Sequence, residues 1–126
     1  MGMDAPKPDA GSPHTLDAAW ELRHRTFHTA LVKACDSPRL MAQRELLADM
    51  SDRYRHLSVA ANIPGRDPAA EHRAIAEAVL ARDGAKGSEL MATHFLETAR
   101  MVLVGFTDLD EAEVLGRIDR IRNEPL

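Results

Sequence analysis

Three short breaks divide this chain into segments whose apolar residues recur every three or four positions. The breaks are Asp36-Ser37-Pro38, the loop from Asn62 to Pro68, and Asp83-Gly84. Proline and glycine interrupt helices, and an aspartate placed just before a segment is a common helix cap. Apolar residues with this spacing form one face of an α-helix, and aromatic residues, which favour strands, make up only 4% of the 126 residues. The sequence therefore predicts an all-α fold, an antiparallel bundle of about five helices.

The breaks also set the expected organisation of the chain. Residues 1–14 contain three prolines and two glycines and are interpreted as a disordered lead-in. Residues 15–104 are expected to form the helical domain, with Thr15 capping its first helix, and residues 105–126 to carry a C-terminal amphipathic helix. In the second helix, the apolar side chains expected to be buried are Leu40, Leu47, Met50, Tyr54 and Leu57.

The start of the third helix carries the clearest capping signals. Asp67 is predicted to be the N-cap, with Pro68 in the first turn. Glu71 lies near the third helical position, which is close to a capping-box arrangement. Val79 and Leu80 are expected on the buried face of this helix.

Composition excludes several classes of protein. The formal net charge is −4, so the chain lacks the basic surface that neutralises nucleic-acid phosphates, and no direct DNA binding is expected. A single cysteine, Cys35, cannot form an internal disulfide and fits a cytoplasmic location. No apolar stretch approaches the ~18 residues that span a bilayer, so no membrane association is expected.

Four histidines lie where a helical protein would need them to hold one metal ion. His24 and His28 are four residues apart, which places them on the same face of a helix. His72 and His94 bracket the Asp83-Gly84 break, and residues equidistant from such a turn come level when two helices fold back on each other. Neutral imidazole is a standard ligand for zinc, nickel and copper. The spacing fits a metal site, and it also fits histidines that are only satisfied core residues.

A longer pattern, from Trp20 to Leu103, resembles a known family. It consists of Phe27-His28-x-x-Leu31, Ala34-Cys35-Asp36-Ser37-Pro38-x-Leu40, Arg53-Tyr54-Arg55, Glu71-His72-x-x-Ile75, the run from Ala78 to Asp83, and Leu90-Met91-x-x-His94 with Thr98. In their order and distances these residues resemble the FCD domain, the effector-binding C-terminal domain of FadR-subfamily GntR transcription regulators. The 22-residue gap between the last two histidines is the family's own spacing.

The resemblance implies a divalent metal held by His24, His28, His72 and His94. In many family members the ligands are three histidines and an aspartate four residues before the first of them. His24 stands in the place of that aspartate, either as a ligand or as a neighbour that supports one. Without a carboxylate the charge of the metal is not compensated by the protein, and an all-nitrogen set favours zinc, with nickel as the second choice.

An uncompensated metal attracts anions, so the expected effector is a small carboxylic acid bound at the metal. Arg53 is a candidate for binding its carboxylate with two parallel hydrogen bonds, and Arg23 and Arg55 are neighbouring candidates. Thr98, one turn after His94, is a candidate for a hydrogen bond to the effector or to its own helix.

Three functions compete at this level. The favoured one is a metal-dependent sensor domain, interpreted as a truncated regulator or a shortened stand-alone relative, because nothing in the chain corresponds to the family's winged helix-turn-helix. Its protein partner is expected to be a second copy, giving a homodimer, or a full-length regulator. The second is a metal-dependent enzyme such as a hydrolase, which is disfavoured because Glu71, the one well-placed base, is expected to cap a helix. The third is a helical dimerisation module without metal.

Overall fold

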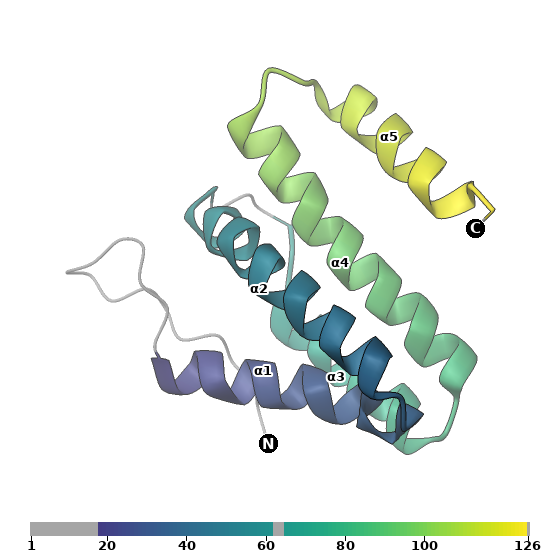
Figure 1. Ribbon diagram of the computed structural model, residues 1–126. Helices are drawn as coiled ribbons and strands as arrows, with labels where there is room; N and C mark the ends of the chain where they lie inside the picture. The colour runs from purple at the N-terminus through teal and green to yellow at the C-terminus, as the bar shows by residue number, and fades with distance from the viewer. Residues whose placement is uncertain (1–17, 62–64, 126) are drawn as a thin grey trace.

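Five α-helices and one short 3-10 turn make up the described part of the chain. The structure is a computed structural model that describes residues 18–61 and 65–125, and for residues 58–61 the backbone alone. The elements are α1 (Ala18–Val32), η1 (Lys33–Cys35), α2 (Pro38–Ala61), α3 (Pro68–Leu80), α4 (Gly84–Phe106) and α5 (Glu111–Asn123) (Figure 1). No strand occurs within these residues, and the predicted all-α fold is confirmed. The expected lead-in and the cap at Thr15 lie outside the described residues.

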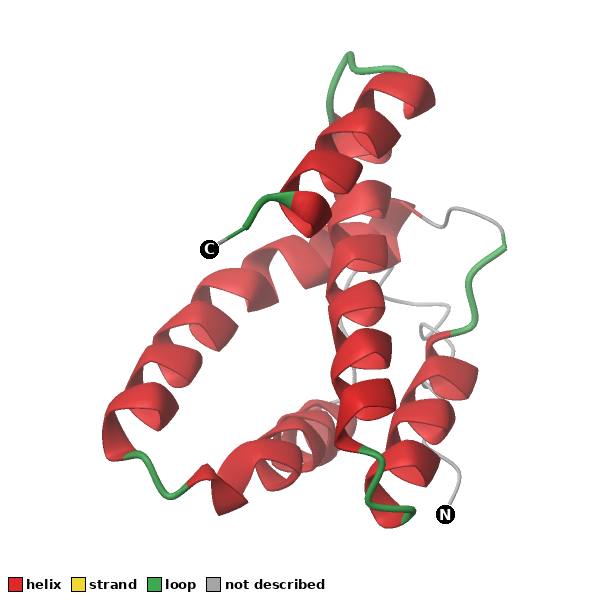
Figure 2. Cartoon of the chain, turned by 90° about the vertical axis from the view of Figure 1, so that its right-hand side faces the viewer, coloured by secondary structure: helices red, strands yellow, loops and turns green. Residues whose placement is uncertain are grey.

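The central helix is α4. The backbones of α2, α3 and α5 each pack closely against it, and α5 folds back antiparallel along its outer side (Figure 1). Figure 2 shows α3 and α4 as neighbouring arms of a hairpin, while α2 meets α4 at one end and diverges from it at the other. In contrast, α1 has no comparably close backbone packing with another long helix. The first helix is therefore attached mainly through its side chains.

Aspartates begin the helices where the sequence predicted them. The Asp67 carboxylate accepts a hydrogen bond of 3.0 Å from the N–H of Ala70, and Asp83 caps α4 in the same way. The capping box expected with Glu71 is not formed, because Ala70 occupies the third helical position and Glu71 lies one residue later. A complete capping box occurs instead at the start of α5, between Asp110 and Glu113.

The centre of the molecule is unusually polar for a domain of this size. The buried apolar side chains of the described residues are few and are Trp20, Ile75, Ala78, Met101 and Val114. The polar residues that are buried as a whole within the same part of the chain are His24, His28, His72 and His94. Because interiors are close-packed, these four rings occupy space that aliphatic side chains usually fill.

The expected burial of the apolar face of α2 is wrong. Leu47 is 61% exposed and Met50 is 56% exposed, and the other side chains predicted with them also face solvent. The opposite face of α2 turns toward α1 and carries charged residues that pair with it: Arg25 of α1 lies 2.8 Å from Glu45 and 2.6 Å from Asp49. Periodicity located the apolar stripe correctly but could not tell which way it faces. Leu80, expected inside, is 83% exposed for the same reason.

None of the described helices is long and apolar enough to cross a membrane. The predicted boundary between residues 104 and 105 falls inside the last turn of α4, which continues to Phe106.

Candidate metal centre

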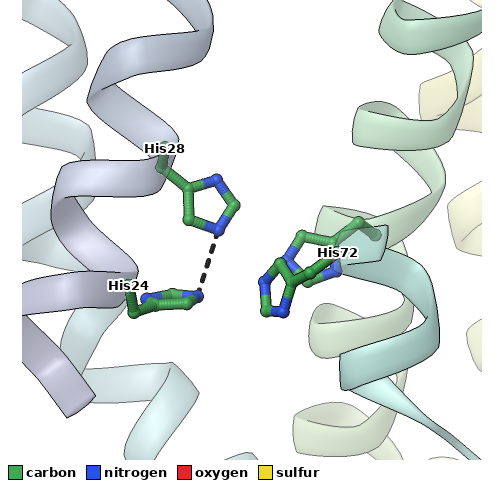
Figure 3. A group of neighbouring side chains, drawn as sticks. His24, His28 and His72 are labelled. Carbon is green, nitrogen blue, oxygen red and sulfur yellow. Dashed lines mark hydrogen bonds between the residues drawn. The ribbon is translucent and has the colours of Figure 1, made fainter. Parts of the chain in front are cut away.

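Three helices bring the four histidines to one place. His24 and His28 lie one turn apart on α1, His72 on α3 and His94 on α4. Each offers one ring nitrogen such that the four atoms all lie within 4.8 Å of one another. Figure 3 shows the two rings of α1 pointing across the interior toward His72, with 3.0 Å between the Nε2 atoms of His24 and His28. The expectation that these residues come together is therefore met, while their role as ligands stays a prediction.

The turn between α3 and α4 explains how His72 and His94 come to lie side by side. His72 and His94 each lie eleven residues from Asp83, the cap that ends the turn between α3 and α4. At that turn Arg82 adopts a left-handed conformation with φ 58°, and the N–H of Asp83 donates to the carbonyl of Ala78 at 2.9 Å. This bond closes a Schellman motif, which reverses the chain tightly. The two rings consequently meet with centroids 4.6 Å apart.

Burial keeps the imidazoles neutral. Removal from water lowers the pKa of His24 to about 2, that of His28 to about 3 and that of His72 to about 4, and neighbouring histidines reinforce each shift. Burial also lowers the pKa of His94, although the hydrogen bond that the ring donates to Glu71 acts in the opposite direction. Neutral rings retain the lone pairs that bind metals, so the environment selects the protonation state that a ligand needs.

Some of the buried nitrogens have no hydrogen-bond partner within the described residues. They are Nδ1 of His28 and both ring nitrogens of His72. A buried polar atom without a partner costs roughly 1–3 kcal/mol of stability. This cost is removed when a bound group supplies the missing partner. A bound transition metal would take one nitrogen from each ring, and His72, whose two nitrogens both lack a partner, would gain one in this way. Neighbouring donors on one zinc or nickel ion lie roughly 3 Å apart, so modest rotations of the rings would bring the set around an ion.

A carboxylate fixes the orientation of His94. Oε1 of Glu71 lies 2.8 Å from Nδ1 of His94, so the ring donates its Nδ1 proton to the carboxylate and keeps Nε2 free for a metal. Glu71 in turn accepts hydrogen bonds of 2.9 Å from Nε and Nη2 of Arg66. Burial opposes ionisation of Glu71, but the hydrogen bonds from Arg66 and His94 outweigh it and hold the pKa below the ordinary value. The capping role expected for Glu71 is therefore wrong.

Arg66 fastens the loop before α3 to α4. Its side chain is only 7% exposed. Besides holding Glu71, it donates to the hydroxyl of Thr98 at 2.8 Å and to the carbonyl of His94 at 3.0 Å. The Thr98 hydroxyl also donates to the His94 carbonyl at 3.3 Å, as one of the two sequence interpretations expected. The sequence analysis did not single out Arg66. Its signal in the sequence is its position directly before the cap Asp67 and shortly before Glu71 and His72.

Of the arginines on α2, Arg55 acts on all four histidines and Arg44 on His28. The charge of Arg55 contributes to the lowered pKa of all four rings, and its guanidinium lies 5.8 Å from the centre of the Trp20 ring. Glu21 and Asp52 bind the same guanidinium. By contrast, Arg53, the effector-binding residue predicted first, is exposed. Its role stays a prediction that the geometry does not favour.

The fold and the cluster together define an all-helical domain with a candidate metal centre at its core. The sequence profile of the FCD domain matches residues 8–97. The chain is 42% identical over 81 residues to the HTH-type transcriptional repressor GlaR of Escherichia coli (strain K12), a match that covers 61% of this chain and 37% of the relative. It is 35% identical over 90 residues to the uncharacterized HTH-type transcriptional regulator BphR of Paraburkholderia xenovorans (strain LB400), over 71% of this chain and 37% of the relative. No solved structure matches the chain significantly.

The chain belongs to the FCD domain family, the effector-binding domains of GntR-type regulators. The resemblance inferred from the sequence is thereby confirmed. The chain spans little more than a third of the length of the two curated relatives, 37% in each case. Membership of this family points to a regulatory, ligand-binding domain and not to an enzyme.

Proposed function

We propose that this domain senses a small organic acid through a divalent metal held by His24, His28, His72 and His94, and so serves a transcription regulator of the GntR type. The observation that carries the proposal is the group of four buried histidines at the meeting point of three helices, with one nitrogen of each within 4.8 Å of the others and with unpartnered nitrogens on His28 and His72. Four imidazoles suit zinc first and nickel second, because both bind nitrogen well. When bound, the metal would supply a positive centre that an acid anion can coordinate.

The charge balance of the site supports an anionic ligand. The four imidazoles are neutral, so they leave the full charge of a dication uncompensated, and the charge of Arg55 is matched by Glu21 and Asp52. Glu71 is the carboxylate closest to the rings, and its charge is matched by Arg66. A metal with five or six coordination positions keeps one or two of them for a carboxylate. We expect Arg55 rather than Arg53 to assist in binding it.

The decisive experiment combines metal analysis with thermal unfolding. Purified protein should contain close to one equivalent of zinc or nickel, and chelation should lower its Tm, because a metal that joins separate helices contributes to folding. His94→Ala should lose the metal, whereas His56→Ala, a change at an exposed histidine of α2, should keep it. Unchanged metal content in both His72→Ala and His94→Ala would rule the site out.

Binding of the acid effector is tested by a separate measurement. The metal-loaded protein should gain thermal stability with small mono- or dicarboxylic acids, and the same acids should have little effect after chelation. Arg55→Lys should weaken this response, while Arg53→Lys should leave it unchanged. An equal response with and without metal would place the acid elsewhere.

An enzymatic role has less support. A metal-dependent hydrolase needs a base that can take a proton from bound water. Glu71 is already engaged by Arg66 and by His94 and has a lowered pKa, which makes it a poor base.

A further inference from the structure

The first helix, α1, buries very little apolar surface. Its buried side chains are Trp20, His24 and His28, so the tryptophan is the one apolar side chain that this helix buries. The ring of Trp20 stacks on that of His24, with centroids 4.7 Å apart. Helices of soluble domains ordinarily bury a continuous apolar stripe, and most of their stability comes from that burial. In α1, two of the three buried side chains are instead candidate metal ligands.

Ion pairs join α1 to α2. Arg25 lies 2.8 Å from Glu45 and 2.6 Å from Asp49, and one turn earlier in α1 Glu21 pairs with Arg55. The side chains of the group around Arg25 are between 41% and 62% exposed. Exposed ion pairs are weak and are screened by salt, with a screening length that falls from roughly 10 Å at 0.1 M to roughly 3 Å at 1 M. The attachment of α1 to α2 is therefore sensitive to ionic strength.

The helices α3, α4 and α5 are held together differently. They contain the other buried apolar side chains of the described residues, which are Ile75, Ala78, Met101 and Val114. Their backbones also pack closely, α3 and α5 each against α4. Salt screens charges but does not weaken apolar contacts, so these three helices should stay together under conditions that loosen α1.

The four histidines of the candidate site are only 3% to 8% exposed, so an ion or an acid reaches them only when part of the structure moves. Figure 1 shows α1 at one edge of the molecule, joined to α2 by a short turn in which Asp36 adopts a left-handed conformation with φ 51°. We propose that α1 is a hinged helix that opens about the turn at Asp36, admits metal and acid to the histidines, and is closed by a metal bound between His24 and His28 and the rings of α3 and α4. The closing step rests on the proposed function, whereas the opening step follows from the contacts of α1 alone.

Trp20 is the single tryptophan of the chain, so its fluorescence reports directly on the docking of α1. In the chelated full chain its emission should shift to the red as NaCl is raised from about 0.05 M to about 1 M, while circular dichroism retains most of the helical signal. Added zinc should return the emission to its low-salt position. Emission that does not respond to salt would overturn the proposal. A red shift that accompanies loss of most of the helical signal would overturn it too, because the domain would then unfold as one unit.

Arg25→Gln tests the ion pairs at constant ionic strength. In the chelated variant the emission of Trp20 should already be shifted to the red at low salt, and an excess of chelator should remove zinc about fivefold faster than from the wild type. The matched control is Arg122→Gln, which breaks an exposed ion pair between α5 and Glu89 of α4 and should match the wild type in both measurements. Equal emission and equal rates in Arg25→Gln and the wild type would overturn the proposal. A chain that binds no zinc would contradict the proposed function, and the salt response of Trp20 would still decide whether α1 opens.

Discussion

Glu71 and His94, which lie on different helices, are joined by a contact of 2.8 Å between Oε1 and Nδ1. This contact selects the tautomer of His94 and holds its ring at a fixed angle. The carboxylate is itself held by the buried guanidinium of Arg66, so the arrangement is rigid from the loop before α3 to the middle of α4.

We expect Glu71→Gln to weaken metal binding by roughly 10- to 100-fold, the usual effect of losing the group that orients a ligand histidine. The neutral amide keeps the size of the side chain but leaves Arg66 without a counter-charge and accepts the His94 proton less strongly. Competition with a coloured chelator measures the affinity. The matched control is Glu77→Gln at an exposed site on the same helix, and equal affinity in both variants would contradict the orienting role.

His24 provides a second prediction, because it stands where related domains place an aspartate. His24→Asp should retain the metal but bind carboxylic acids more weakly, since the added negative charge lowers the attraction of the site for anions. His24→Ala should lose metal affinity. Metal titration and the acid-induced shift in Tm distinguish the two effects. If His24→Ala binds metal as tightly as wild type, His24 supports the site without coordinating.

Acidification should destabilise the metal-free protein in a defined window. The pKa values of His24, His28 and His72 lie near 2, 3 and 4 in the folded state, against about 6.5 for an unfolded histidine. Unfolding therefore takes up protons below pH 6.5, so the stabilisation from neutral rings is complete above pH 6.5 and is lost as the pH falls toward 4.

The pH range over which stability is lost distinguishes these histidines from the carboxylates. The pKa of Glu71 is lowered below its ordinary value, so its contribution is lost at still more acidic pH. Urea unfolding of the chelated protein between pH 7 and pH 4 is the measurement, and the midpoint should fall steadily. A midpoint that is flat over this range would show that the rings are not buried in the neutral form.

The turn between α3 and α4 offers a stabilising substitution. Arg82 has φ 58°, a conformation that costs a side-chain-bearing residue about 1 kcal/mol and glycine much less. Arg82→Gly should therefore raise the Tm by about 2–6 °C in the metal-free protein. Arg82→Ala, which removes the same side chain but keeps the strain, should not. A rise in both variants would assign the effect to charge and not to backbone conformation.

Most of the fold can be predicted from the sequence, because the turns are marked by residues that each have one physical role. The positions of Asp67 and Asp83 alone predict them as caps, and spacing together with the family resemblance predicts the histidine cluster. The inward face of α2 could not be read in this way. Its direction depends on long-range pairs such as Arg25 with Glu45, which local periodicity does not contain. Hydrophobicity alone therefore assigned the wrong face to the interior.

Glu71 illustrates a second limit. One residue separates a capping position from a position that faces α4, and in a helix that step is a rotation of about 100°. Helix boundaries predicted from sequence are uncertain by more than this, so the pairing of Glu71 with Arg66 and His94 follows only from the three-dimensional structure. Arg53 and Arg55 show the same effect: a shift of two residues along α2 decides which arginine is near the rings.

The four histidines come from three different helices, so a metal and an acid that meet there share one site. Thermodynamic reciprocity then applies: the factor by which the metal tightens the acid is also the factor by which the acid tightens the metal. The apparent affinity for the acid would change with the concentration of free metal. The supply of metal in a cell would then set the concentration of acid to which the domain responds.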